Sequence, residues 1–167
     1  MEKSVKITIK SVHITPSGDD AVTPAVVDVF SIDDYDPNDT QRIDVDYEGV
    51  LRDSPERLEV EYAETTLTGM EGTTTCISYE KSNPGLIIMS RAGTVSSMLC
   101  FEAGERIICS QSTDEMALSL VIDTAEVRNA LTSDGGEIKI AYGIEFRGSI
   151  VERTVLIIEV RVEKNGR

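Results

Sequence analysis

The chain has 167 residues, of which 40% are hydrophobic, so it has the length of one domain and enough apolar side chains for a sizeable core. Its 30 acidic and 16 basic residues give a formal net charge of −14, which repels phosphate backbones and anionic lipids, so we expect neither nucleic acid nor a membrane as partner. The first ten residues lack the apolar stretch of a signal peptide and no segment is apolar over the length of a bilayer, so we expect a single domain, residues 1–167, in the cytoplasm.

The N-terminal segment alternates apolar and polar residues. Val5, Ile7 and Ile9 alternate with lysines and a threonine, and this period of two predicts a half-buried strand that runs to about residue 14. Residues 15–41 break the rhythm, because they contain three prolines and seven aspartates and no lysine or arginine. We expect a loosely packed acidic loop or excursion, whose apolar middle, residues 25–30, docks as a short strand or turn.

Neither acidic clusters nor cysteines match a metal site. If a calcium loop began at Asp34, its sixth position would be Asp39 instead of glycine, and its twelfth would be Val45 instead of glutamate. The three cysteines lack the closely spaced pairs of a zinc site, and we expect free thiols. The sequence thus predicts no metal and no cofactor.

From residue 43 onward, short alternating segments follow one another at regular intervals, separated by turns rich in Gly, Pro, Asn and Asp. Many short strands joined by tight turns predict an all-β fold, an antiparallel meander of about 8–10 strands that closes into a barrel. The predicted strands cover residues 43–51, 58–65, 73–79, 86–91, 94–101, 105–110 and 116–124, followed by a hairpin of 136–146 and 151–162.

Residues 124–131 allow two interpretations. Val127, Ala130 and Leu131 have helical spacing, whereas a bulge near Ala125 would let the preceding strand continue. Both stay open.

Several patches of the chain together resemble one family. In their order and spacing they resemble the YwiB-like family of bacterial proteins, also known as the domain of unknown function DUF1934. The resemblance covers residues 43–162 and implies a calycin-like β-barrel, the architecture of lipocalins and fatty-acid-binding proteins. The family has no established activity, so the resemblance implies an architecture and no function. The patches are Tyr62 to Ile77, Ser90 to Gly93, Met98 to Phe101, Gly104, and Gly135 to Tyr142.

The sequence departs from the family pattern twice. The acidic segment at 15–41 looks like an insertion, and residues 112–116 replace a turn that more often contains glycine.

A barrel of this size is either filled by its own side chains or holds one small ligand. Strand parity places Glu64 on the core side with Tyr62 and places Thr75 there with Ile77, while Arg91 ends a strand near the mouth. An arginine fixed there would recognise a carboxylate or phosphate. The predicted ligand-binding cluster at one end of a cavity consists of Tyr62, Glu64, Thr75, Arg91 and Tyr142. The competing interpretation leaves the two charges in solvent and the tyrosines as ordinary core residues.

No catalytic motif of any specificity is present, and we predict no catalytic residue. His13 is the only histidine, and no serine or cysteine stands near it in the context of a nucleophile, so we expect an exposed strand residue and not a general base. The function that we favour is a small-molecule-binding module. The alternatives are a protein-interaction or structural barrel with a filled interior, and an enzyme of unrecognised type.

The last strand is apolar on both faces, unlike a barrel wall that meets water. If Val155 and Ile157 face inward, the alternate positions form an outer patch that needs a cover. The cover could be residues 25–30, a helix at 124–131, or a second subunit, and we favour a homodimer through the outer face of Thr154 to Val162. On that assumption the patch is Leu156, Ile158 and Val160.

Overall fold

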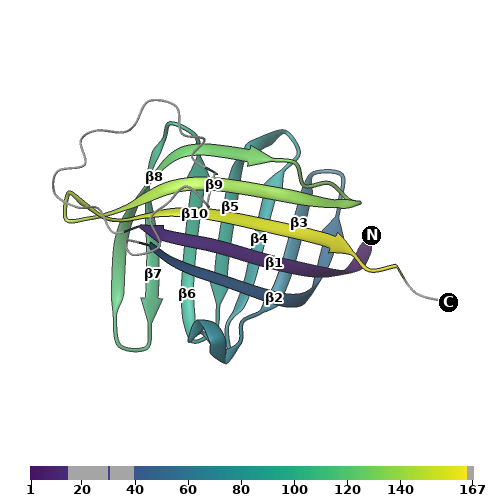
Figure 1. Ribbon diagram of the computed structural model, residues 1–167, viewed down its shortest axis with the longest axis horizontal. Coiled ribbons are helices and arrows are strands. Elements are labelled where there is room, and N and C mark those ends of the chain that lie inside the picture. The colour runs from purple at the N-terminus through teal and green to yellow at the C-terminus, as the bar shows by residue number, and fades with distance from the viewer. Residues whose placement is uncertain (15–29, 31–39, 165–167) are drawn as a thin grey trace.

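The computed structural model is a closed antiparallel β-barrel of ten strands (Figure 1), which confirms the predicted all-β fold. It describes residues 1–14, 30 and 40–164, so most of the acidic segment, including the aspartates at 33–39, lies outside the described residues. One turn of 3-10 helix, η2, spans Thr66–Thr68. The strands are β1 (Glu2–Ile14), β2 (Thr40–Asp53), β3 (Arg57–Ala63), β4 (Thr74–Glu80), β5 (Asn83–Ala92), β6 (Val95–Glu102), β7 (Arg106–Thr113), β8 (Ala117–Asn129), β9 (Gly135–Phe146) and β10 (Ser149–Val162).

Each strand pairs with its neighbours in the chain, and β1 closes the barrel by pairing with both β2 and β10. Ile7 is the register partner of Tyr47 on one side and of Val160 on the other, so the first and last strands share one inward face. The described residues include no helix long and apolar enough to cross a membrane.

Residues 124–131 form the end of a bulged strand and not a helix. The pairing of β8 with β9 shifts between Thr124 and Glu126, which leaves Ala125 exposed at the bulge. Because β9 supplies backbone partners as far as Asn129, the helical spacing of the apolar residues is overridden by sheet pairing.

The interior differs between the two ends of the barrel. In an antiparallel meander the starts of the odd strands lie beside the ends of the even strands, and at this end β1 begins and β10 ends (Figure 1). Buried Leu131 closes it, and its carbonyl oxygen accepts a hydrogen bond of 2.6 Å from the Tyr79 hydroxyl. We call this the capped end. Its fully buried side chains include Val5, Leu51, Leu58, Ile87, Phe101 and Ile138.

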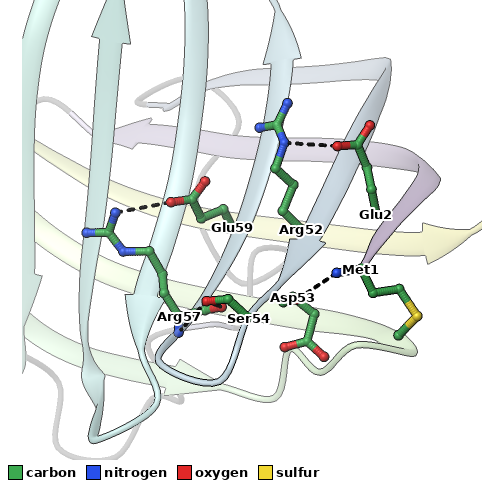
Figure 2. A pocket seen from close by; sticks show the side chains of 7 residues that line it. All are labelled: Met1, Glu2, Arg52, Asp53, Ser54, Arg57 and Glu59. Atoms are coloured by element: carbon green, nitrogen blue, oxygen red, sulfur yellow. Dashed lines mark hydrogen bonds and ion pairs between the residues drawn. The ribbon is translucent and has the colours of Figure 1, made fainter.

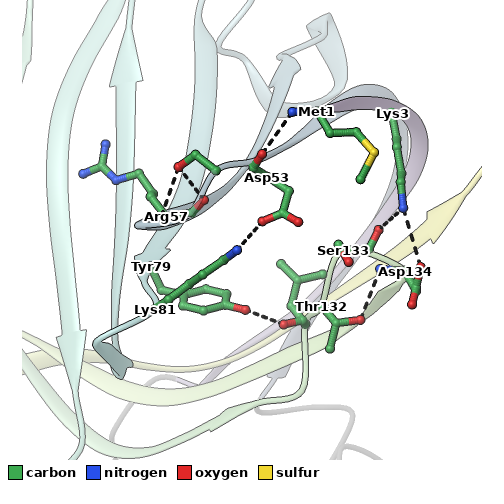
Figure 3. A network of polar contacts seen from close by, with 11 residues as sticks. Met1, Lys3, Asp53, Arg57, Tyr79, Lys81, Thr132, Ser133 and Asp134 are labelled. Atoms are coloured by element: carbon green, nitrogen blue, oxygen red, sulfur yellow. Dashed lines mark hydrogen bonds and ion pairs between the residues drawn. The ribbon is translucent and has the colours of Figure 1, made fainter.

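Polar contacts join the loops around the capped end (Figure 3). The Met1 amine donates to the Asp53 carbonyl oxygen at 3.1 Å, and Lys81 pairs with the Asp53 carboxylate. Lys3 donates to the Ser133 carbonyl oxygen at 2.7 Å. Residues 1–3 are thereby tied to the end of β2 and to the loop between β8 and β9.

The side chains of β10 that face the interior are the alternate set to the one assumed from the sequence. Leu156 and Ile158 are the register partners of Ile140 and Ile138, so they face the interior with the apolar face of β9. Val155 and Ile157 therefore lie on the outside. The prediction failed because a strand that is apolar on both faces does not reveal its phase.

Phe30 covers the outer apolar patch. Its side chain is 6% exposed and clusters with Ala141, Val155 and Ile157. The guanidinium of Arg128 lies 4.6 Å from the centre of its ring, a cation–π contact. A residue of the acidic segment thus serves as a cover, while residues 25–29 lie outside the described residues and a homodimer through this strand pair stays a prediction.

Replacing Phe30 by alanine tests the cover. We expect Phe30→Ala to lower the free energy of unfolding by about 3 kcal/mol, because the ring is buried against three apolar side chains. Ile108→Ala is the matched control, since Ile108 is 77% exposed and should change stability by less than about 0.5 kcal/mol. Urea denaturation measures both. Equal values for the two variants would leave the patch to be covered by a second subunit.

Candidate functional site

The polar side chains of the interior gather at the end of the barrel opposite the capped end. They come from the ends of odd strands and the starts of even strands, which meet there. We call this region the polar end. Its side chains include Ser11, His13, Tyr47, Tyr62, Glu64, Thr75, Arg91, Ser97, Thr124, Tyr142, Glu152 and Thr154.

Glu64 is the centre of the first group of these side chains. Its carboxylate is 2% exposed and accepts hydrogen bonds from Tyr47 at 2.9 Å and from Thr75 at 2.7 Å. A third comes from Thr68 at 3.0 Å. Three donors replace water around a buried charge, which makes its burial tolerable.

The segment directly after β3 holds the Glu64 carboxylate in this place. The backbone N–H of Glu64 donates to the carbonyl oxygen of Thr73 at 2.8 Å, so sheet pairing continues one residue beyond β3. The following turn η2 then brings Thr68 back over Glu64, and Gly69 ends the turn with a φ of 72°, a conformation that favours glycine.

Arg91 is the charge partner of Glu64. Its Nε lies 4.0 Å from Glu64 Oε1, close enough for an ion pair and too far for a hydrogen bond. Arg91 faces Thr75 across the strands, and Thr75 in turn faces Tyr62. The structure thereby brings together four of the five residues predicted for the site.

Tyr142, the fifth, lies apart on β9. Its ring packs against Phe101 with the ring centres 4.7 Å apart, and it is the register partner of Thr124 and Thr154. It shares the polar end with the Glu64 group and feels the charge of Arg91.

The phenols of the polar end are held in the neutral form. Burial raises the pKa of Tyr62 well above its usual range, and the negative charge of Glu64 adds to this. Burial and then the hydrogen bond to Glu64 raise the pKa of Tyr47 in the same way. Burial raises the pKa of Tyr142 to about 12. These side chains are therefore hydrogen-bond donors and not phenolate nucleophiles at neutral pH.

Three buried polar atoms find no hydrogen-bond partner within the described chain. They are Nε of Arg91, Oγ of Ser97 and Oγ1 of Thr124. Ser97 is the register partner of Arg91, so two of these atoms come from adjacent positions on β5 and β6. Buried polar atoms are nearly always satisfied in folded proteins, so these three atoms are exceptions that call for an explanation.

Sequence reasoning missed Tyr47, Thr68, Ser97 and Thr124. A signal for Tyr47 was available, because it stands in the inward phase of its strand, two residues after Val45. A signal for Thr124 was also available, because it stands two residues after buried Ile122 and before the bulge, whereas Thr68 reaches Glu64 only through the local turn.

Two surface hollows stand out, and neither is in the interior. The larger, of about 460 Å³, lies at the rim of the capped end (Figure 2), where Arg52 pairs with Glu2 at 3.3 Å and Arg57 pairs with Glu59 at 3.1 Å. The other, of about 300 Å³, is lined by Lys6, Asp46, Tyr47, Glu48 and Arg161. In the larger hollow the charges already pair with one another in water, which makes it a poor candidate for a specific site.

Within the described ranges, no group of three or more His, Cys, Asp or Glu residues could hold a metal ion. Cys76, Cys100 and Cys109 are free thiols. Burial raises the pKa of Cys76 to about 11, which keeps it a poor nucleophile.

Comparison with known proteins finds a family model and a solved structure that are similar to this chain. The family model described as "Domain of unknown function (DUF1934)" matches residues 29–158. The crystal structure of the ywiB protein from Bacillus subtilis is similar, with a TM-score of 0.73 and 16% identity over 98% of this chain and 94% of that one. At this identity the likeness concerns the fold alone. No curated protein matches the chain.

Glu64→Gln tests the buried carboxylate. We expect a loss of about 1–3 kcal/mol in the free energy of unfolding, because the amide turns a donor toward hydroxyls that need an acceptor and leaves Arg91 without its counter-charge. Glu61→Gln is the control, since Glu61 pairs with Arg52 at a side chain 39% exposed and should cost less than about 1 kcal/mol. Urea denaturation of both variants decides; a smaller loss for Glu64→Gln than for the control would contradict a stabilising role.

The raised phenol pKa values predict a loss of stability in alkali. Between pH 10 and about 12 the unfolded chain has released the Tyr142 proton and the folded chain has not. The free energy of unfolding should therefore fall as pH rises through this window, and the contribution should be complete below pH 10. Tyr142→Phe should show a smaller fall in denaturation experiments across the same range. An equal fall would assign the effect to other tyrosines.

Proposed function

The chain belongs to the family described as a domain of unknown function, DUF1934, and we propose that it binds a small ligand with one anionic group at the polar end of its barrel. The observation that carries this proposal is the set of three unpartnered buried polar atoms on Arg91, Ser97 and Thr124. Arg91 and Ser97 are register partners on β5 and β6, at the end of the interior where most of the other polar side chains gather.

The chemistry of Arg91 favours an anionic group. Its guanidinium presents a planar fork of donors that matches a carboxylate or a phosphate, and its Nε makes no hydrogen bond to the described residues. Glu64 holds it by charge at 4.0 Å without occupying that donor. Because the Glu64 oxygens accept from Tyr47, Thr68 and Thr75, the carboxylate is less able to compete with a ligand for Arg91.

The filled core at the capped end limits the size and the place of the ligand. Fully buried Leu51, Ile87 and Phe101 are part of one continuous apolar cluster, so a ligand would lie at the mouth of the barrel and not deep within it. The net charge of −14 also disfavours multiply charged anions at a distance.

The apolar side chains that fill the interior also support a second function. A barrel whose interior is occupied by its own side chains, with the described hollows on its surface, also fits a protein-interaction or structural role. The two proposals differ in whether Arg91 contacts a small molecule.

Binding measurements on an Arg91 series separate the two functions. Native mass spectrometry of freshly purified protein would detect a retained ligand, and calorimetry with a panel of monocarboxylates and phosphate monoesters would measure affinity. We expect Arg91→Gln to weaken binding at least about tenfold, or 1.4 kcal/mol, and Arg91→Lys to weaken it less. Arg57→Gln, which removes an outer-wall arginine paired with Glu59, should have no effect.

Two results would overturn the ligand proposal. If no member of the panel binds the folded wild type and nothing is retained on purification, the filled-barrel function replaces it. If Arg57→Gln loses binding while Arg91→Gln keeps it, the ligand occupies the hollow at the capped end instead.

A further inference from the structure

A second chain of polar contacts at the polar end joins a serine, a histidine and a glutamate. Ser11 Oγ lies 3.2 Å from Nε2 of His13, and Nδ1 of His13 forms a short contact with Oε1 of Glu152. Thr154 donates to the same glutamate oxygen at 3.0 Å. This is the order of contacts, hydroxyl to imidazole to carboxylate, that activates a serine nucleophile.

These contacts select one tautomer of His13. A carboxylate accepts and does not donate, so Nδ1 carries the proton that faces Glu152. Nε2 is then left with its lone pair toward the hydroxyl of Ser11, 3.2 Å away. A neutral imidazole in this state is ready to accept a proton from the serine.

One of these contacts joins two residues of the same strand, and the other joins two strands that are neighbours in the barrel. Ser11 and His13 stand two residues apart on β1, so their side chains share its inward face. Glu152 comes from β10, where Thr154 is the register partner of His13. The sequence predicted an exposed strand histidine; the side chain of His13 is 28% exposed, and its partners are a neighbour in the strand and a residue 139 positions away.

We propose that Ser11 is a nucleophile, with His13 as its general base and Glu152 as the positioning residue, and that the polar end hydrolyses small activated carboxylic esters. Ser11 Oγ bonds to the ester carbonyl carbon while its proton passes to Nε2 of His13. The C–O bond to the alcohol breaks, and the leaving oxygen takes that proton. Water then attacks the acyl carbon on Ser11 while one of its protons passes to His13. The bond from the acyl carbon to Ser11 Oγ breaks, the carboxylic acid leaves, and the proton on His13 restores the serine hydroxyl.

The surroundings of Ser11 define the acyl group. Ser11 is 8% exposed, and its register partners across β1 are the apolar residues Ile43 and Leu156. These apolar neighbours favour an uncharged acyl group, and the small exposed fraction of Ser11 favours a short one such as acetyl. The inference does not rest on the proposed anion site, because it uses neither Arg91 nor Glu64.

Covalent labelling tests the nucleophile directly. The full chain is incubated with diisopropyl fluorophosphate, whose phosphorus bonds to the oxygen of an activated serine while fluoride leaves and the base takes the serine proton. Intact mass and peptide mapping locate the adduct. We expect one adduct, on Ser11. Ser11→Ala should show none, and His13→Gln should slow labelling about 100-fold or more. Ser110→Ala, which alters an exposed serine of β7, should label as the wild type does.

Ester turnover separates positioning from a structural role. Hydrolysis of p-nitrophenyl acetate should fall in Glu152→Gln through kcat and be partly restored in Glu152→Asp, with both variants keeping the melting temperature of the wild type within a few degrees. A purely structural tie between β1 and β10 would change stability and leave turnover unchanged. The proposal is overturned if the wild type takes no adduct, if peptide mapping finds the adduct elsewhere, or if Glu152→Gln retains full kcat.

Discussion

Closure of the sheet by β1 is the constraint on which the rest of this structure depends. Because β1 pairs with β2 on one side and with β10 on the other, no strand of the described barrel is left with a free edge. Closure also determines which side chains of these strands face the interior. Ile7 is the register partner of both Tyr47 and Val160, so the inward faces of β1, β2 and β10 are aligned with one another. Every side chain at the polar end owes its position to that alignment.

The two ends of the interior illustrate different ways of filling a barrel. At the capped end, apolar side chains pack against one another and the loops above them are tied by backbone and charged contacts such as that between Lys3 and Ser133. At the polar end, charge and hydroxyl groups are buried with some of their bonding capacity unused. The apolar packing at the capped end thus stabilises the fold, while the polar end holds the groups whose bonding capacity is not fully used.

The fold could be predicted because its strands alternate clearly. Residues 136–146 show the period of two almost without fault, and the phase of residues 58–64 correctly places Glu64 on the same side as Tyr62. What failed has a physical cause in each case. Residues 154–158 are apolar on both faces and so conceal their phase, and the bulge at Ala125 shifts parity by one residue. The contact between His13 and Glu152 comes from closure, which no local pattern encodes.

The same closure has a consequence for the order in which the chain folds. Neighbouring strands of the meander can pair as they appear, but Val5 meets Val162 only after nearly the whole described chain has been made. Contacts of such long sequence separation slow folding, and during synthesis the free edge of β1 stays open to other chains. Folding of this barrel is therefore expected to end with a single slow closing step, and the interval before it is the period in which the nascent protein most needs protection from aggregation.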